Sequence, residues 1–134
     1  MRIKFNVKAD VPNANGVVYP KAVLQKMFDE YSKQDHKYGT LKYGNSWDVR
    51  LDEIAFKVRS VNEESDEFEG EIEILDTPAG KQLEKELDCI PEKYRLCTCV
   101  TCNTMTDDKK DNILIVKDDA RIDYVVLIPK EDCA

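Results

Sequence analysis

The stretch Glu71-Ile-Glu-Ile-Leu-Asp-Thr-Pro-Ala-Gly-Lys81 has the pattern of a β-strand that turns sharply into an α-helix. Its first four residues alternate polar and apolar, which is the period of a half-buried strand. Asp76 and Thr77 are residue types that cap helix N-termini, and Pro78 suits the first helical position. The sequence therefore predicts a strand-to-helix junction, with the helix ending near Asp88.

Upstream of this junction, the apolar spacing predicts three further elements. Ile, Phe and Val alternate with polar residues in Arg2–Lys8 and Val49–Val61, which predicts two strands. Apolar residues recur at helical spacing from Pro20 to Lys33. The acidic segment Asn62–Glu67 predicts a turn, so the strand Phe68–Leu75 would form an antiparallel hairpin with the preceding strand.

Downstream of the junction, alternation predicts strands at Tyr94–Thr104, Asn112–Val116 and Ile122–Ile128, with a charged turn at Asp107–Asp111. The polar, glycine-containing segment Gln34–Trp47 predicts a loop with at most a short strand. The sum is about six strands and two helices. We therefore expect an α+β domain that is mainly antiparallel β, folded as a compact sheet or small barrel.

The size and charge of the chain limit the classes of function that it can have. At 134 residues and 15.4 kDa, we expect residues 1–134 to form one domain around one core. No apolar run is long enough to span a membrane, and the start of the chain shows no apolar signal segment, so secretion is not expected. A net charge of −7 argues against nucleic acid as the main partner and favours a protein surface.

Four segments resemble, in this order, the head maturation (prohead) proteases of tailed bacteriophages. These segments are Asn15-Gly-Val-Val-Tyr-Pro20 with the helix after it, Leu51-Asp-Glu-Ile-Ala-Phe-Lys-Val58, Glu69–Lys81 and Ile122-Asp-Tyr-Val-Val-Leu-Ile-Pro129. Together they extend over nearly the whole chain. The resemblance implies a prohead-protease-like fold.

The family's catalytic pair is a serine nucleophile and a histidine base, and this sequence departs from both. The family histidine follows a Gly-X-Leu element; here Gly39-Thr-Leu41 is followed by Lys42. A lysine is protonated at neutral pH unless it is buried. The strand expected to carry the serine reads Leu96-Cys-Thr-Cys-Val-Thr-Cys102 and contains none. The resemblance therefore implies a degenerate member, with no catalytic residues expected.

An active variant would need other residues in these roles. Cys97, Thr98 or Cys99 would be the nucleophile, and His36 or Lys42 the base. His36 lies in a charged stretch that is typical of an exposed surface. Cysteine and threonine are also ordinary strand residues, and a free cysteine packs as a small apolar side chain.

Five cysteines suggest a second chemistry. Without a secretory signal we expect reduced thiols at Cys89, Cys97, Cys99, Cys102 and Cys133. A zinc site is the weaker interpretation, because a strand would place Cys97 and Cys99 on one face and Cys102 on the other. We expect no metal and no cofactor.

Two surface features remain. The acidic cluster predicts a solvated hairpin turn rather than a calcium site, and it consists of Glu63, Glu64, Asp66, Glu67 and Glu69. The aromatic residues Tyr38, Tyr43 and Trp47 indicate either an interaction surface or core packing.

Taken together, these features favour a phage virion structural protein, auxiliary or decorating, that binds the major capsid protein and has lost its catalytic residues. It would be made in the host bacterial cytoplasm and reside in the capsid; a homo-oligomer is compatible with the sequence. The alternatives are an active maturation endopeptidase with a Cys or Thr nucleophile, and a zinc-dependent module.

Overall fold

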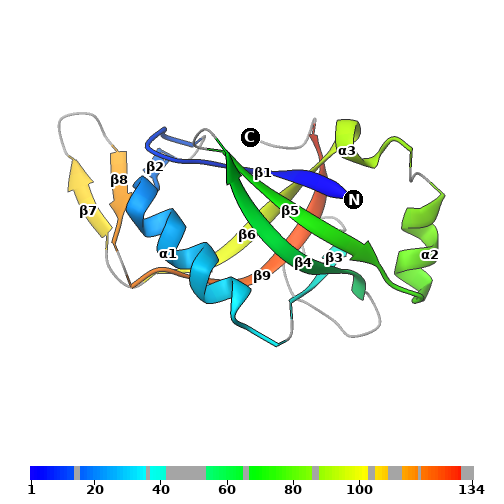
Figure 1. The fold of residues 1–134 in the computed structure, drawn as a ribbon. Coiled ribbons are helices and arrows are strands. Elements are labelled where there is room, and N and C mark those ends of the chain that lie inside the picture. The colour runs from blue at the N-terminus through cyan, green and yellow to red at the C-terminus, as the bar shows by residue number, and fades with distance from the viewer. Residues whose placement is uncertain are drawn as a thin grey trace.

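The computed structural model describes residues 1–13, 16–35, 37–41, 54–64, 67–85, 88–102, 105–108, 113–117 and 119–130. Six strands close into a barrel in the order β1-β5-β4-β3-β9-β6 (Figure 1). These strands are β1 (Arg2–Lys8), β3 (Tyr38–Leu41), β4 (Ile54–Glu64), β5 (Glu67–Ile74), β6 (Tyr94–Thr101) and β9 (Arg121–Pro129). The expected mainly antiparallel α+β fold is confirmed, and of the two expected forms, a compact sheet or a small barrel, it is the barrel. The expected total of about six strands and two helices is too low, because the described residues also form a second sheet and a third helix.

A second sheet and three helices complete the described part of the fold. The sheet has the order β2-β8-β7 and lies at one end of the molecule, whereas α2 lies at the other (Figure 1). Its strands are β2 (Val17–Val18), β7 (Met105–Asp108) and β8 (Ile113–Val116), and the helices are α1 (Lys21–Ser32), α2 (Pro78–Glu84) and α3 (Ile90–Lys93).

Two parallel pairings close the barrel. β5 pairs antiparallel with β1 and β4, β4 with β3, and β6 with β9. β1 pairs parallel with β6, where Phe5 is opposite Leu96, and β3 pairs parallel with β9. Both parallel contacts join segments that are far apart in the sequence, so alternation within one strand carries no signal for them.

Helix α1 packs its apolar side against the barrel. Leu24, Met27, Phe28 and Tyr31 recur at helical spacing and are all buried. The Phe28 ring stacks on Phe68 with centroids 4.5 Å apart and meets Phe5 edge-on at 4.8 Å. Each such side chain contributes about 1.5–3 kcal/mol by leaving water, so this aromatic cluster anchors α1 to β1 and β5.

The strand-to-helix junction between β5 and α2 is held together by hydrogen bonds. The Thr77 side chain accepts a hydrogen bond from the Gly80 N–H at 3.0 Å, and its hydroxyl donates to the Ile54 carbonyl. The Leu75 N–H donates to the Ala55 carbonyl at 2.9 Å. These bonds connect the start of α2 to the first residues of β4. The predicted N-cap and proline positions are therefore confirmed.

The predicted helix to Asp88 is too long. α2 ends at Glu84, and the Lys85 N–H donates to the Leu83 carbonyl in a tight terminal turn. A separate short helix, α3, follows at Ile90, with proline in its first turn. A proline there is compatible with a helix start, because the first N–H groups have no partner within a helix.

Both predicted charged turns are shorter than expected. β4 and β5 keep pairing out to Glu64 and Glu67, because the cross-strand hydrogen bonds continue through the acidic segment. β7 takes Asp107 and Asp108 into a strand that pairs with β8. The strand predicted to Thr104 ends at Thr101 as β6, and the predicted strand start at residues 49–53 lies outside the described residues.

A phenol is buried without a partner inside this core. Tyr31 is 1% exposed, and its hydroxyl has no hydrogen-bond partner among the described residues. Burial raises the pKa of Tyr31 well above its ordinary value, so the phenol stays neutral. We expect Tyr31→Phe to raise the free energy of unfolding by about 1 kcal/mol in urea denaturation, because an unpaired buried polar group is removed. A loss of stability would contradict this account.

In the described part of the chain, none of the helices has the length and apolar character needed to cross a bilayer.

Candidate functional site

The two segments in which the sequence resemblance leads us to look for catalytic residues, β3 with the residue after it and β6, flank the same strand. β3 pairs with β9 on one side, and β6 pairs with β9 on the other. Thr40 and Cys97 are both opposite Val126, while Gly39 and Thr98 are both opposite Val125. Neighbouring strands are about 4.8 Å apart, so β3 and β6 lie about 10 Å apart across β9. The topology therefore brings both segments into one region of the barrel wall.

Alternation along β6 decides which side chains face outward. Leu96 is fully buried, and its Cδ1 lies 2.8 Å from where a Cβ on Gly70 of β5 would be, so Leu96 points into the barrel. Thr98 is two residues further along the strand and shares that inward face. Cys97 and Cys99 therefore point outward.

The outward row carries the accessible thiols. Thr40 and Val126 are each 2% exposed although they face away from the interior, whereas Cys97 and Cys99 are partly exposed. A partly exposed thiol can act as a nucleophile when a base stands beside it. Cys97 and Cys99 thus lie on the outer face of β6 and Thr98 lies on the inner face, while all three side chains are partly exposed.

The structure does not describe the two candidate bases. His36 and Lys42 both lie outside the described residues, as do Tyr43, Trp47, Asp66 and Cys133. Lys42 directly follows Leu41, the last residue of β3. No pairing of base and nucleophile is therefore assigned.

The cysteines do not gather in the described structure. Cys97 and Cys99 share the outward face of β6, whereas Cys102 follows the strand and packs against the core. Cys89 is the residue before α3. Within the described ranges, no three His, Cys, Asp or Glu side chains are placed to hold a metal ion.

Cys102 instead belongs to a small polar cluster. Its Sγ donates to Asp119 Oδ1 at 3.8 Å, and Tyr19 lies within electrostatic range of Cys102. Burial first, and Cys102 second, raise the pKa of the Tyr19 phenol. Sequence reasoning missed Tyr19 and Asp119 because neither stands in a motif with Cys102.

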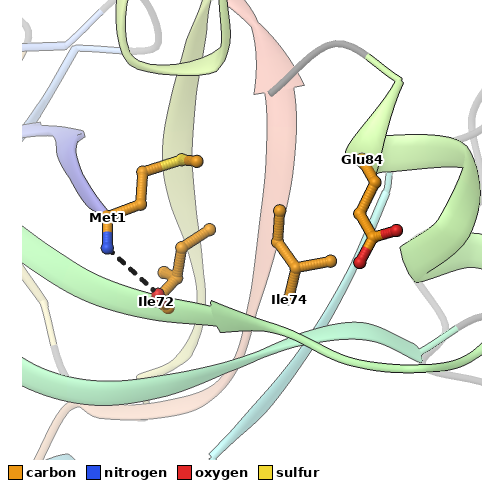
Figure 2. A pocket seen from close by; sticks show the side chains of 4 residues that line it. All are labelled: Met1, Ile72, Ile74 and Glu84. Carbon is orange, nitrogen blue, oxygen red and sulfur yellow. Dashed lines mark hydrogen bonds between the residues drawn. The ribbon is translucent and has the colours of Figure 1, made fainter. Parts of the chain in front are cut away.

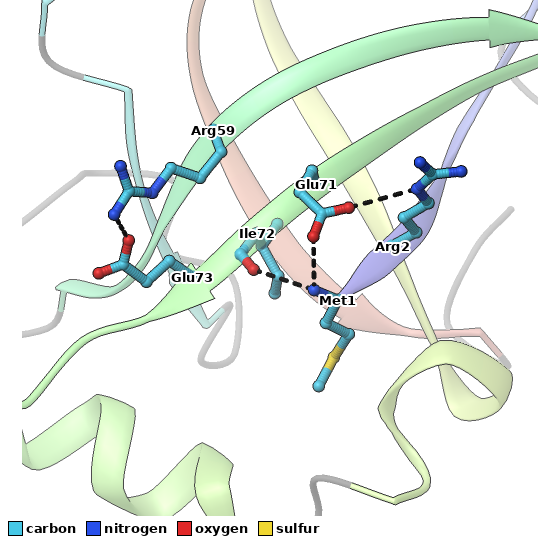
Figure 3. Close-up of polar contacts among 6 residues, drawn as sticks. All are labelled: Met1, Arg2, Arg59, Glu71, Ile72 and Glu73. Atoms are coloured by element: carbon cyan, nitrogen blue, oxygen red, sulfur yellow. Dashed lines mark hydrogen bonds and ion pairs between the residues drawn. The ribbon is translucent and has the colours of Figure 1, made fainter.

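Carboxylates of the β4–β5 hairpin form ion pairs within the hairpin and with neighbouring elements. Glu71 accepts from the Met1 amino group at 2.9 Å and from Arg2 at 3.3 Å, and Arg59 pairs with Glu73 (Figure 3). The hydrogen bond from the Met1 amino group is the main cause that lowers the pKa of Glu71. Glu63 pairs with Lys21 at 3.7 Å. The carboxylates thus neutralise cations on the neighbouring elements.

A pocket opens where β5 leads into α2. It has a volume of about 430 Å³ and is lined by Met1, Ile72, Ile74 and Glu84 (Figure 2). The apolar walls come from the strand alternation and the side chain of Met1, and the carboxylate comes from α2. Alternation could identify Ile72 and Ile74 as one face, but no local pattern places Met1 and Glu84 beside them.

One solved structure relates the fold to a known protein. No family model matches the chain, and no curated protein matches it. The structure of the bacteriophage T4 capsid assembly protease, gp21, aligns with a TM-score of 0.69 at 17% sequence identity, over 95% of this chain and 80% of that chain. This likeness establishes a prohead-protease-like fold and confirms that part of the expectation. The loss of catalytic residues stays a prediction.

Proposed function

We propose that this protein is a structural component of a phage virion, an auxiliary or decoration protein that binds the major capsid protein. It would use the prohead-protease-like barrel as a scaffold and no longer cleave peptide bonds. The fold is shared with a capsid assembly protease. The step from that fold to capsid binding is an analogy, because a fold alone does not define an activity.

One observation carries the proposal. The β6 strand, where the family serine is expected, contains no serine, and β3 is followed by Lys42 rather than histidine. A serine protease needs a nucleophile and a base within hydrogen-bond reach. Neither residue type is present at its expected position, whereas the strands that would carry them are intact.

The location in the particle tests this function. We expect the protein to be present intact and at a fixed copy number per capsid in purified virions, measured by quantitative mass spectrometry. A protein that is absent from mature particles, or present only as its own cleavage fragments, would behave like a maturation protease and would contradict the proposal.

The alternative function is an active maturation endopeptidase. It is favoured by the outward, partly exposed thiols of Cys97 and Cys99 on β6, the strand in which the sequence resemblance leads us to expect the nucleophile. Thr98 is partly exposed like the two cysteines, but its hydroxyl is a weaker nucleophile than a thiolate. The base would be His36 or a Lys42 that is neutral because it is buried.

A further inference from the structure

The pocket beside α2 has a preformed shape. Ile72 is 4% exposed, and its N–H donates to the Met1 carbonyl at 2.8 Å, so β1 and β5 hold two of its walls together. Leu83, 2% exposed, anchors α2 in the core, while the Thr77 cap fixes where the helix starts. The pocket is open to solvent, and its volume of about 430 Å³ leaves room for a side chain of a partner to enter.

The pocket combines an apolar floor with a carboxylate that the described residues leave unpaired. Figure 2 shows Met1, Ile72 and Ile74 on one side and Glu84 across from them. Glu84 is exposed and has no ion-pair partner among the described residues. The nearby carboxylates of Glu71 and Glu73, by contrast, are already paired with arginines (Figure 3).

This contrast defines the chemistry of the occupant. An apolar side chain of a partner can enter a pocket with these apolar walls, and a well-packed anchor can carry much of the energy of an interface. A lysine or arginine beside that anchor would pair with Glu84, and the net charge of −7 also favours a cationic partner. An acidic segment would place like charges together.

We propose that the pocket of Met1, Ile72, Ile74 and Glu84 binds a partner protein segment in which an apolar side chain is followed by lysine or arginine. The inference rests on the proposed function, because it assigns this segment to the capsid protein. The chemistry of the pocket can nevertheless be tested without the capsid.

Two small probes test the chemistry. Protein labelled at its Met and Ile methyl groups is titrated with N-acetyl-leucyl-lysine amide or N-acetyl-leucyl-glutamate amide, and NMR shifts are followed. We expect the lysine probe to shift the methyl signals of Met1, Ile72 and Ile74 in a saturable way, and the glutamate probe to bind more weakly. No binding, equal binding of both probes, or shifts confined to other residues would overturn the proposal.

Matched variants isolate the carboxylate. Glu84→Gln keeps the size of the side chain and should weaken the lysine probe about two- to fivefold, the range of an exposed ion pair. Glu64→Gln is the control, because Glu64 is an exposed glutamate at the end of β4. An unchanged affinity in Glu84→Gln, or an equal loss in both variants, would contradict a role for Glu84.

Capsid binding separates this inference from the proposed function. In co-sedimentation with capsid shells, Glu84→Arg should bind less than the wild type, while its far-ultraviolet circular dichroism stays unchanged. If the wild type and Glu84→Arg bind equally, the assignment of the capsid segment to this pocket is wrong, but the proposed function stands. If the wild type does not bind shells, the proposed function is wrong, and so is the assignment of a capsid segment to this pocket.

Discussion

Gly80→Ala is expected to destabilise the protein by about 4 kcal/mol or more, which is exceptional for a single substitution. A Cβ on Gly80 would lie 1.9 Å from the Leu75 carbonyl oxygen and 3.0 Å from the Ala55 carbonyl oxygen. Both neighbours are backbone atoms, and the Leu75 N–H is bonded to Ala55. Relief would therefore require that α2 move away from β4, with loss of the Thr77 cap.

Urea unfolding followed by circular dichroism measures this loss. A domain of ordinary stability has about 5–15 kcal/mol to lose, so the variant should unfold at much lower urea or fail to fold. Glu84→Ala on the same helix is the matched control and should change stability by about 0.5 kcal/mol or less. A Gly80→Ala variant as stable as that control would refute the close packing of this corner.

Gly39→Ala is expected to cost about 3 kcal/mol by overpacking the barrel interior. A Cβ on Gly39 of β3 would lie 2.1 Å from the ring of Phe56, its partner on β4. Phe56 is fully buried, so its ring has no free space to enter. This absence of a side chain on β3 is what admits the large ring next to it.

A second substitution makes this prediction specific. Phe56→Leu alone should cost about 1.5 kcal/mol, and in the double variant the two losses should not add, because the smaller side chain makes room for the new methyl group. The unfolding free energies of the four proteins give the coupling. Strictly additive losses would show that Gly39 and Phe56 do not share this space.

The parts of the fold that sequence could predict are those with a local physical cause. Alternation places Ile72 on the buried face of β5, and the Thr77-Pro78 pair starts α2 because both residues satisfy the first turn of a helix. Alternation also places Cys97 and Cys99 on one face of β6 and Thr98 on the other. This separates the candidate nucleophiles without any structure.

What sequence could not predict depends on distant contacts. Phe5 is opposite Leu96 in a parallel pair of strands, and the sequence of neither strand predicts which strand it pairs with. The short α3 was missed because Pro91 suggests the end of a helix, although it stands in the first turn. The pocket could not be predicted, because Met1 and Glu84 come to line the same pocket only when β1, β5 and α2 are assembled.

In the function that we propose, the barrel serves for binding and no longer cleaves peptide bonds. The most direct measurement incubates the purified protein with shells assembled from the major capsid protein that we propose as its partner, and follows both sedimentation and the intact mass of the capsid protein. The account predicts saturable co-sedimentation at a fixed ratio, with the capsid protein uncut. Site-specific cleavage of the capsid protein that is lost in Cys97→Ala or Cys99→Ala would contradict it.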